Sequence, residues 1–351
     1  MQRYGGISRY FANLNNGINK LPGQSSSISA FYSENEYIKN NGLPLNNALG
    51  RRLFNGHMNR IARWNRRYTQ QVIKAGNFDV LHPTYYDPYF VPFLNKPFVL
   101  TVHDMIHELL PPFASDAEEV KEQKRITIKA ADKIIAISEN TKRDIIKFYP
   151  EAESKIEVVY HGYVPTVSEP ITLTLPEKYI LFVGERWHYK NFTRLVNALS
   201  GLLQKDPELS LLCIGGGAFN ESEKALFAKY GIAAKCLQIN ATDEVLTKAY
   251  QRAQLLVFPS LLEGFGLPLL EAFANNCPVV CSNTSSMPEV GGDAARYFDP
   301  RDETDIQNAV QKVLYDDALQ QRFKAKGLEQ LALFSFDTCL QNTVKVYETL
   351  L

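Results

Sequence analysis

The sequence has no apolar run near the roughly 20 residues that a membrane-spanning helix needs, and it has no excess of charge of either sign. Lys plus Arg and Asp plus Glu each number 38, so we expect no general affinity for nucleic acid. The N-terminal residues contain no apolar stretch like that of a secretory signal. The sequence therefore predicts a cytoplasmic protein that does not span a membrane.

Cysteine is scarce, with five residues, and the five do not form a set of metal ligands. Cys277 and Cys281 are separated by three residues, but no cluster of His or Cys completes a zinc site. Cys213 and Cys281 lie in apolar, strand-like runs, where cysteine behaves as a small buried hydrophobe. We therefore expect reduced thiols in the core and no bound metal.

Short apolar runs alternate with amphipathic stretches along the whole chain. The runs are rich in Val, Ile, Leu and Phe without polar alternation, which is typical of parallel strands buried on both faces. We predict strands at residues 27–32, 78–82, 98–102, 133–137, 156–160, 179–183, 209–214, 236–239, 255–258 and 278–281. This alternation predicts an α/β protein with two doubly wound, Rossmann-like sheets.

The length of 351 residues suits two domains. Residues 162–176 include three prolines and little helical pattern, as expected of a linker. We therefore assign residues 1–162 to a first domain, 163–335 to a second and 336–351 to a final helix. A doubly wound domain normally starts with a strand before its first glycine loop, whereas Gly5 and Gly6 come almost at once. We therefore expect that the start is incomplete and that the first strand is missing.

The strongest motif covers residues 259–272, where an apolar strand leads through a glycine-containing turn into a helix. Gly264 and Gly266 allow a tight turn, so amides at the helix start can face an anion or hydroxyl groups. Glu263 and Glu271 bracket the turn, about 12 Å apart along the helix. They would then hold two ends of one extended ligand. The alternative is that neither residue binds a ligand: one acid caps the helix and the other is an ordinary surface glutamate.

Three other positions carry chemistry. Lys190 stands at a helix start after a strand, where a cation and free amides suit a diphosphate, although an exposed lysine there would also be ordinary. His103 follows the strand at 98–102, at the edge where α/β sheets bind ligands. Asp104 beside it would orient the imidazole or cap a turn. The glycine run at residues 215–217 does not indicate a dehydrogenase, because Asn220 replaces the third glycine of the dinucleotide fingerprint.

These motifs resemble those of the family 4 retaining glycosyltransferases. The run P-S-L-L-E-G-F-G-L-P-L-L-E-A at residues 259–272 is similar to the donor-site signature of that family, and Gly184 with Lys190 resembles its phosphate loop. Further similar segments are T-V-H-D at 101–104, A-I-S-E-N-T at 136–141 and V-V-Y-H-G at 158–162. The run G-G-I-S-R-Y-F at residues 5–11 is especially similar to a branch rich in bacterial surface-polysaccharide mannosyltransferases.

The resemblance implies the GT-B fold, in which two Rossmann-like domains face each other across a cleft and the last helix returns to the first domain. It implies a hexosyltransferase that moves a sugar, with retention, from a nucleotide sugar to a glycan or lipid-linked glycan. The pathway would be bacterial lipopolysaccharide (O-antigen) or exopolysaccharide synthesis. Our first candidate donor is GDP-mannose, with a UDP-sugar as the alternative because Asn240 stands where many relatives carry glycine. No metal or other cofactor is implied.

The resemblance also assigns roles to residues. The catalytic residues would be His103, which contacts the transferred sugar, together with Glu263 and Lys190. Lys190 would hold the donor pyrophosphate, with Arg186 as a second candidate cation, because Glu185 stands where relatives often have arginine. The remaining donor-side residues would be Gly6, Gly264, Phe265, Gly266, Leu267 and Glu271, the last on the ribose hydroxyls. The acceptor-side residues would be Gly5 and Asp104.

Two other functions stay open: an epimerase that acts on the nucleotide sugar alone, and an inactive subunit that binds the donor. Residues 37–78 contain eight Lys and Arg and no acid, and apolar residues recur there at three- and four-residue steps. An amphipathic helix of this kind would dock residues 51–74 on anionic lipid at the inner face of the membrane. Equally, it would cover the core and leave a solvated basic face.

Overall fold

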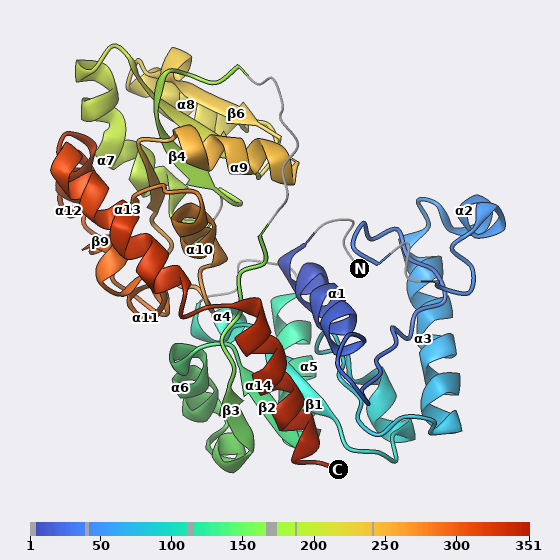
Figure 1. Ribbon diagram of the computed structural model, residues 1–351. Helices are drawn as coiled ribbons and strands as arrows, with labels where there is room; N and C mark the ends of the chain where they lie inside the picture. Colours follow the sequence, from blue (N-terminus) through green and yellow to red (C-terminus); the bar gives the residue numbers. More distant parts are fainter. Residues whose placement is uncertain (1–4, 39–41, 111–115, 166–173, 187, 241) are drawn as a thin grey trace. The chain divides into compact units, whose positions relative to one another are not determined.

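The computed structural model describes residues 5–38, 42–110, 116–165, 174–186, 188–240 and 242–351. The chain divides into two compact units (Figure 1). The first comprises Met1–Ile137, Lys142–Val159 and Asp337–Leu351, and the second comprises Ser138–Thr141 and Tyr160–Phe336. The division falls after Val159, whereas the sequence predicts a domain boundary after residue 162. No helix in the described part of the chain is long and apolar enough to cross a membrane.

The first unit is built on a parallel sheet in the order β1-β2-β3. Its strands are β1 (Val99–Val102), β2 (Lys133–Ala136) and β3 (Ile156–Val158). Its helices are α1 (Gly6–Ile18), α2 (Ala48–Phe54), α3 (Met58–Ala75), α4 (Ile106–Leu109), α5 (Ala117–Ala130), α6 (Glu139–Phe148) and α14 (Phe336–Glu348), the first turn of α6 and the first residue of α14 belonging to the second unit. Leu100, Val102 and Ile134 are fully buried in its core, as strands covered on both faces require.

Two strands that the sequence predicts for the first unit are wrong. Residues 27–32 do not form a strand, because their backbone bonds to side chains of α3. The amides of Phe31 and Tyr32 donate to Asn65 Oδ1 at 2.8 and 3.1 Å, and Thr69 donates to the Ser29 carbonyl at 2.9 Å. Of residues 78–82, Leu81 makes only an isolated bridge to the chain just before β1. The other three predicted strands agree with β1 to β3 within two residues.

The second unit holds a six-stranded parallel sheet in the order β6-β5-β4-β7-β8-β9. Its strands are β4 (Lys178–Val183), β5 (Leu209–Ile214), β6 (Cys236–Ile239), β7 (Leu255–Phe258), β8 (Val279–Ser282) and β9 (Ala295–Phe298). Its helices are α7 (Phe192–Lys205), α8 (Glu221–Lys229), α9 (Asp243–Arg252), α10 (Leu267–Ala274), α11 (Met287–Gly291), α12 (Glu303–Leu314) and α13 (Asp317–Leu331). All five predicted strands are confirmed. β9 escaped prediction because the exposed Arg296 interrupts its apolar run.

This sheet grows in two directions from β4, and that topology decides where a ligand can bind. The chain adds β5 and β6 on one side of β4 and then β7, β8 and β9 on the other. The order therefore reverses between β4 and β7, and ligands of doubly wound sheets bind at the carboxyl ends of the strands at this switch point. All five cysteines are buried and unlinked to one another, as the apolar runs predict.

Candidate active site

The loops that follow β4 and β7 bring two predicted residues together at the switch point. Lys190 ends a short 3-10 helix, η3 (His188–Lys190), after β4, and Glu263 lies in the loop after β7. Lys190 Nζ is 2.6 Å from Glu263 Oε1, and the two side chains are 16% and 13% exposed. The structure therefore shows an ion pair that is largely, but not fully, withdrawn from water.

Backbone contacts between the two loops hold this pair in place. The Leu261 amide donates to the Tyr189 carbonyl at 2.7 Å. Asn191 Nδ2 donates to the Pro259 carbonyl at 3.1 Å, from a residue whose φ of 60° lies in the left-handed region. Since asparagine is among the residues that tolerate this conformation best, the K-N pair suits the start of α7. The relative positions of Lys190 and Glu263 thus do not depend on their charges alone.

Two serines after β8 fasten the loop from the other side, and we call Ser285 and Ser286 the serine clasp. The Glu263 amide donates to Ser285 Oγ at 3.0 Å, and Ser286 Oγ donates to the carbonyls of Glu263 and Phe265 at 3.0 and 2.9 Å. Phe265 itself is buried. The sequence analysis did not single out the clasp, whose one signal is its place after a strand of the same sheet edge.

The glycine turn leads directly into α10. The Gly264 carbonyl accepts hydrogen bonds from the hydroxyls of Ser138 at 2.7 Å and Thr141 at 3.1 Å, both of which belong to the second unit. Gly266 caps the helix with a φ of 100°, a conformation that other residues rarely adopt. The helix begins at Leu267. Pro268 has no N–H and the Leu269 amide donates to the Gly266 carbonyl at 2.9 Å, so the Leu267 amide is the candidate hydrogen-bond donor at this turn.

Glu271 has a buried partner. It lies in α10, and the hydroxyl of Tyr250, from α9, donates to Glu271 Oε2 at 2.9 Å. Tyr250 is only 1% exposed. Burial, and then the Glu271 carboxylate, raises the pKa of Tyr250, so its hydroxyl is a donor at any ordinary pH. Glu271 is therefore not an ordinary surface glutamate, which was the alternative that the sequence left open.

Arg186 is engaged by protein groups. Its Nε donates to Glu223 Oε1 at 2.9 Å, its Nη1 to the Gly215 carbonyl at 2.6 Å and its Nη2 to the Gly217 carbonyl at 2.8 Å. Gly215, Gly216 and Gly217 have φ of 94°, 69° and 68°, so the glycine run permits a backbone that wraps the guanidinium. These partners give Arg186 a role in shaping the loop after β5 and leave Lys190 as the candidate cation for the donor.

In the first unit, His103 follows β1 directly and is buried. The Tyr86 hydroxyl accepts from its amide at 3.0 Å, and the rings of Tyr10 and Phe11 meet the imidazole edge-on at 5.8 and 6.2 Å between centroids. Burial lowers the pKa of His103 to about 4, so the imidazole is neutral near pH 7. A neutral imidazole can hydrogen-bond a sugar hydroxyl but brings no charge to the site.

Of the two roles predicted for Asp104, the structure shows the turn cap. Asp104 Oδ1 accepts from the Ile106 amide at 3.0 Å, at the start of α4. The fully buried Lys124, from α5, donates to the Asp104 carbonyl at 2.8 Å and to Glu108 Oε2 at 3.0 Å. Burial would raise the pKa of Asp104, but Lys124 and the Ile106 amide outweigh it and lower that pKa. Sequence reasoning missed Lys124, which resembles any other lysine of an amphipathic helix.

Gly5 and Gly6 begin α1. Gly5 is the N-cap residue, and its carbonyl accepts from the Arg9 amide at 3.0 Å. A Cβ on Gly6 would meet nothing within 4 Å, so the first amides of this helix have open space beside them. That space would let an anion approach the helix start closely.

A buried histidine also connects the last helix to the rest of the first unit. His82 Nδ1 lies 2.6 Å from the Tyr347 hydroxyl of α14, and His82 Nε2 lies 2.8 Å from Thr101 Oγ1. Burial lowers the pKa of His82 to about 3. This network gives His82 a structural role, one that neither motif nor spacing indicates in the sequence.

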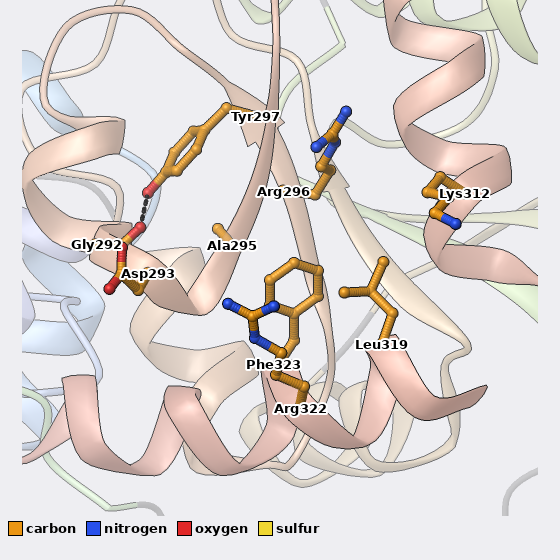
Figure 2. Close-up of a pocket in the computed structure, with 9 residues that line it drawn as sticks. All are labelled: Gly292, Asp293, Ala295, Arg296, Tyr297, Lys312, Leu319, Arg322 and Phe323. Atoms are coloured by element: carbon orange, nitrogen blue, oxygen red, sulfur yellow. Dashed lines mark hydrogen bonds between the residues drawn. The ribbon is translucent and has the colours of Figure 1, made fainter. Parts of the chain in front are cut away.

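A hollow of about 590 Å³ lies at the β9 edge of the second unit's sheet, between β9, α12 and α13 (Figure 2). Figure 2 shows Arg296, Lys312 and Arg322 around it, with the Tyr297 hydroxyl turned away to the Gly292 carbonyl at 2.7 Å. None of the residues predicted for the donor or acceptor lines this hollow. It is therefore separate from the switch-point site.

The predicted basic helix is α3, preceded by α2. It buries Ile61 and Ile73, while Met58 and Trp64 are 49% and 44% exposed. Trp64 also stacks on Phe31, with 5.7 Å between ring centroids. The helix therefore combines a core-facing stripe with an exposed apolar and basic face.

Comparison with known proteins identifies the family. Residues 4–166 match Glycosyltransferase Family 4, and residues 166–330 match Glycosyl transferases group 1. The chain is 44% identical over 108 residues to O-antigen chain mannosyltransferase B of Escherichia coli, covering 31% of this chain and 28% of the relative. It is 26% identical over 243 residues to O-antigen chain mannosyltransferase RfbU of Salmonella typhimurium, covering 69% and 67%.

The chain spans under a third of the length of another group of relatives, the serotype-specific mannosyltransferases WbdA of Escherichia coli, at 30% identity. Among solved structures it is similar to HepE of Anabaena in complex with UDP and glucose, at a TM-score of 0.74 and 14% identity over 99% of this chain and 96% of that one. It is also similar to WaaG, a glycosyltransferase of lipopolysaccharide biosynthesis, at a TM-score of 0.72 and 14% identity over 98% and 96%. The chain thus belongs to the group 1, family 4 glycosyltransferases and has their GT-B fold, with two Rossmann-like domains.

Proposed function

We propose that this glycosyltransferase moves mannose from GDP-mannose, with retention, to a glycan or lipid-linked glycan during the synthesis of a bacterial surface polysaccharide. The observation that carries the proposal is the Lys190–Glu263 ion pair at the switch point of the second unit. The mannosyl donor is supported by relatives named as O-antigen mannosyltransferases. A UDP-sugar is the alternative donor, because HepE binds UDP-glucose.

The chemistry that this site performs is the stabilisation of a departing diphosphate. Breaking the bond between the anomeric carbon and the diphosphate places negative charge on the leaving group. Lys190 supplies a cation for that charge, and the Leu267 amide at the start of α10 supplies a hydrogen-bond donor. Without donor, the Lys190 charge is matched by Glu263. When the diphosphate pairs with Lys190 in place of Glu263, the Glu263 carboxylate can accept hydrogen bonds from the sugar hydroxyls.

Retention follows from a front-face reaction, since no carboxylate is assigned as a nucleophile. The acceptor hydroxyl attacks the anomeric carbon from the side on which the diphosphate departs, and its proton passes to an oxygen of the leaving phosphate. The neutral imidazole of His103 contacts the transferred sugar. The reaction needs no metal and no cofactor, because Lys190 and amides take the part that a cation plays elsewhere.

The test is a transfer assay with GDP-mannose, UDP-glucose and UDP-N-acetylglucosamine, each with short mannosyl oligosaccharide acceptors, with product configuration read by NMR. We expect transfer from GDP-mannose with retained configuration, unchanged by a chelator. Transfer from a UDP-sugar alone would replace the donor, and an epimerised donor without acceptor would favour the epimerase. Absence of any reaction, with Glu271-dependent nucleotide binding intact, would leave the inactive donor-binding subunit.

We also propose that α2 and α3 dock on anionic lipid, which would bring the enzyme to a lipid-linked acceptor. Arg51, Arg52, Arg63 and Arg67 are exposed, and so is the apolar Met58. A shallow hollow of about 570 Å³ at the start of α3 is lined by apolar and basic side chains together. Cations beside exposed apolar residues match the interface of an anionic bilayer.

Co-sedimentation with phosphatidylcholine vesicles, with and without phosphatidylglycerol, tests this docking. Replacing Arg51, Arg52 and Arg63 by alanine should weaken binding to the anionic vesicles about a hundredfold. The matched control replaces Lys205, Lys224 and Lys229, three exposed cations of the second unit, and should leave binding unchanged. Equal loss in both triple variants, or no binding by the wild type, would contradict the docking proposal.

A further inference from the structure

Glu271 is held by a buried tyrosine from a different helix. Tyr250 lies in α9 and is 1% exposed, and its hydroxyl donates to Glu271 Oε2 at 2.9 Å. Close packing around a side chain enclosed to this degree holds its ring and hydroxyl in place. A hydrogen bond to an ionised carboxylate is roughly twice as strong as one between neutral groups.

This contact fixes the orientation of the carboxylate and not merely its presence. A glutamate on a helix has three rotatable bonds, and the last of them turns freely in solvent. The hydrogen bond from Tyr250 to one carboxylate oxygen selects one rotamer and one plane for the group. Two neighbouring hydroxyls of a ribose ring can be gripped by one carboxylate only if that plane is correctly set.

We propose that Tyr250 is a positioning residue that sets the selectivity of this site for ribose over deoxyribose nucleotides, acting through Glu271. The inference rests on the proposed function, in which Glu271 binds the ribose of the donor. Tyr250 itself touches no substrate. Its hydroxyl holds the carboxylate so that the 2′- and 3′-hydroxyls of the nucleotide are recognised together.

The structure offers a matched control in Tyr179, at the start of β4. Tyr179 is fully buried, and its hydroxyl donates to the Ala249 carbonyl of the same helix, α9, at 2.7 Å. Tyr179→Phe and Tyr250→Phe therefore each remove one hydroxyl and one buried hydrogen bond beside α9. Both changes should lower the melting temperature by a few degrees. Only one of them removes a contact to Glu271.

The experiment is calorimetric titration of wild type, Tyr250→Phe, Tyr179→Phe and Glu271→Ala with GDP and 2′-deoxy-GDP, and in parallel with UDP and 2′-deoxy-UDP. We expect Tyr250→Phe to weaken binding of the ribonucleotide about tenfold and to lower the ribose-to-deoxyribose preference by a similar factor. Tyr179→Phe should keep both values within about twofold of wild type.

The outcomes separate this inference from the proposed function. If Glu271→Ala loses nucleotide binding while Tyr250→Phe keeps the wild-type ribose preference, the site stands and the role of Tyr250 is overturned. The role of Tyr250 is also overturned if Tyr179→Phe lowers the preference as much as Tyr250→Phe does. If the folded wild type binds none of the four nucleotides, the proposed function itself fails.

Discussion

Arg186 and Glu223 form an ion pair in which Nε and Oε1 are 2.9 Å apart and the side chains are only 4% and 9% exposed. The remaining guanidinium donors bond to carbonyls of the glycine loop after β5. A cation enclosed in this way shapes the second unit, whereas Lys190 has a more accessible side chain, at 16% exposure, and is our candidate for the donor.

Replacing Arg186 by methionine should therefore act on stability first. Breaking a buried pair leaves Glu223 uncompensated, so we expect the free energy of unfolding to fall by about 3 kcal/mol. Urea denaturation measures this, and Arg322→Met, at an exposed arginine of the same unit, is the control. Unchanged stability together with lost donor affinity would show that Arg186 binds the donor instead.

Lys190→Met should act on catalysis. Loss of one group that stabilises the departing diphosphate should lower kcat about a hundredfold. Steady-state kinetics with the preferred donor measures the effect. The control is Lys312→Met, which removes an exposed lysine that lies 3.4 Å from Asp316 and should leave kcat unchanged. A normal kcat for Lys190→Met would remove Lys190 from the mechanism.

The serine clasp should matter for donor binding as well as for stability. Ser286→Ala removes the one hydroxyl proton that the carbonyls of Glu263 and Phe265 share, so we expect the free energy of unfolding to fall by about 2 kcal/mol and KM for the donor to rise. Ser282→Ala is the control, because Ser282 is equally buried and donates to Phe258, one strand away, at 3.4 Å. An unchanged KM in Ser286→Ala would limit the clasp to a structural role.

The buried histidines predict how stability depends on pH. Burial lowers the pKa of His103 to about 4 and that of His82 to about 3, from 6.5 in each case. Between these lowered pKa values and 6.5, the unfolded chain binds protons at the two histidines that the folded chain does not. The free energy of unfolding should therefore increase as the pH is raised from about 4 to about 6.5, and decrease as the pH is lowered through the same range.

Urea midpoints across this range test the pH dependence, with His103→Asn as the comparison. The variant should show a shallower rise with pH than the wild type, because it lacks one of the histidines whose pKa burial lowers. A wild-type midpoint that stays level, or that falls as the pH increases through this range, would contradict the assigned protonation states.

The fold of the second unit could be predicted from its apolar runs, because parallel strands buried on both faces leave an unbroken signal. Residues 27–32 gave a similar signal but bond to Asn65 of α3, a side chain more than 30 positions away. Pattern alone does not reveal such a partner. The exposed Arg296 hid β9 for the related reason that edge strands need not be apolar.

The residues of the candidate site also fall into two groups, those that the sequence indicated and those that only the structure revealed. Glu263 and Glu271 could be found because one motif with fixed spacing carries them, and Lys190 because it stands at a helix start after a strand. Tyr250 and Lys124 could not, because each acts through a partner 16 or more positions away and is of a residue type common in helices. Sequence thus indicated the groups that we propose bind the donor, and the structure added the groups that hold them.

The most direct measurement is calorimetric titration of the purified chain with GDP, UDP and ADP, with Glu271→Ala beside it. The account predicts micromolar binding of GDP in preference to UDP and ADP, and loss of that binding in the variant. Selective binding of UDP would keep the site and change the donor. A folded wild type that binds no nucleotide, or one whose affinity survives Glu271→Ala, would contradict the central claim that this switch point is the donor site.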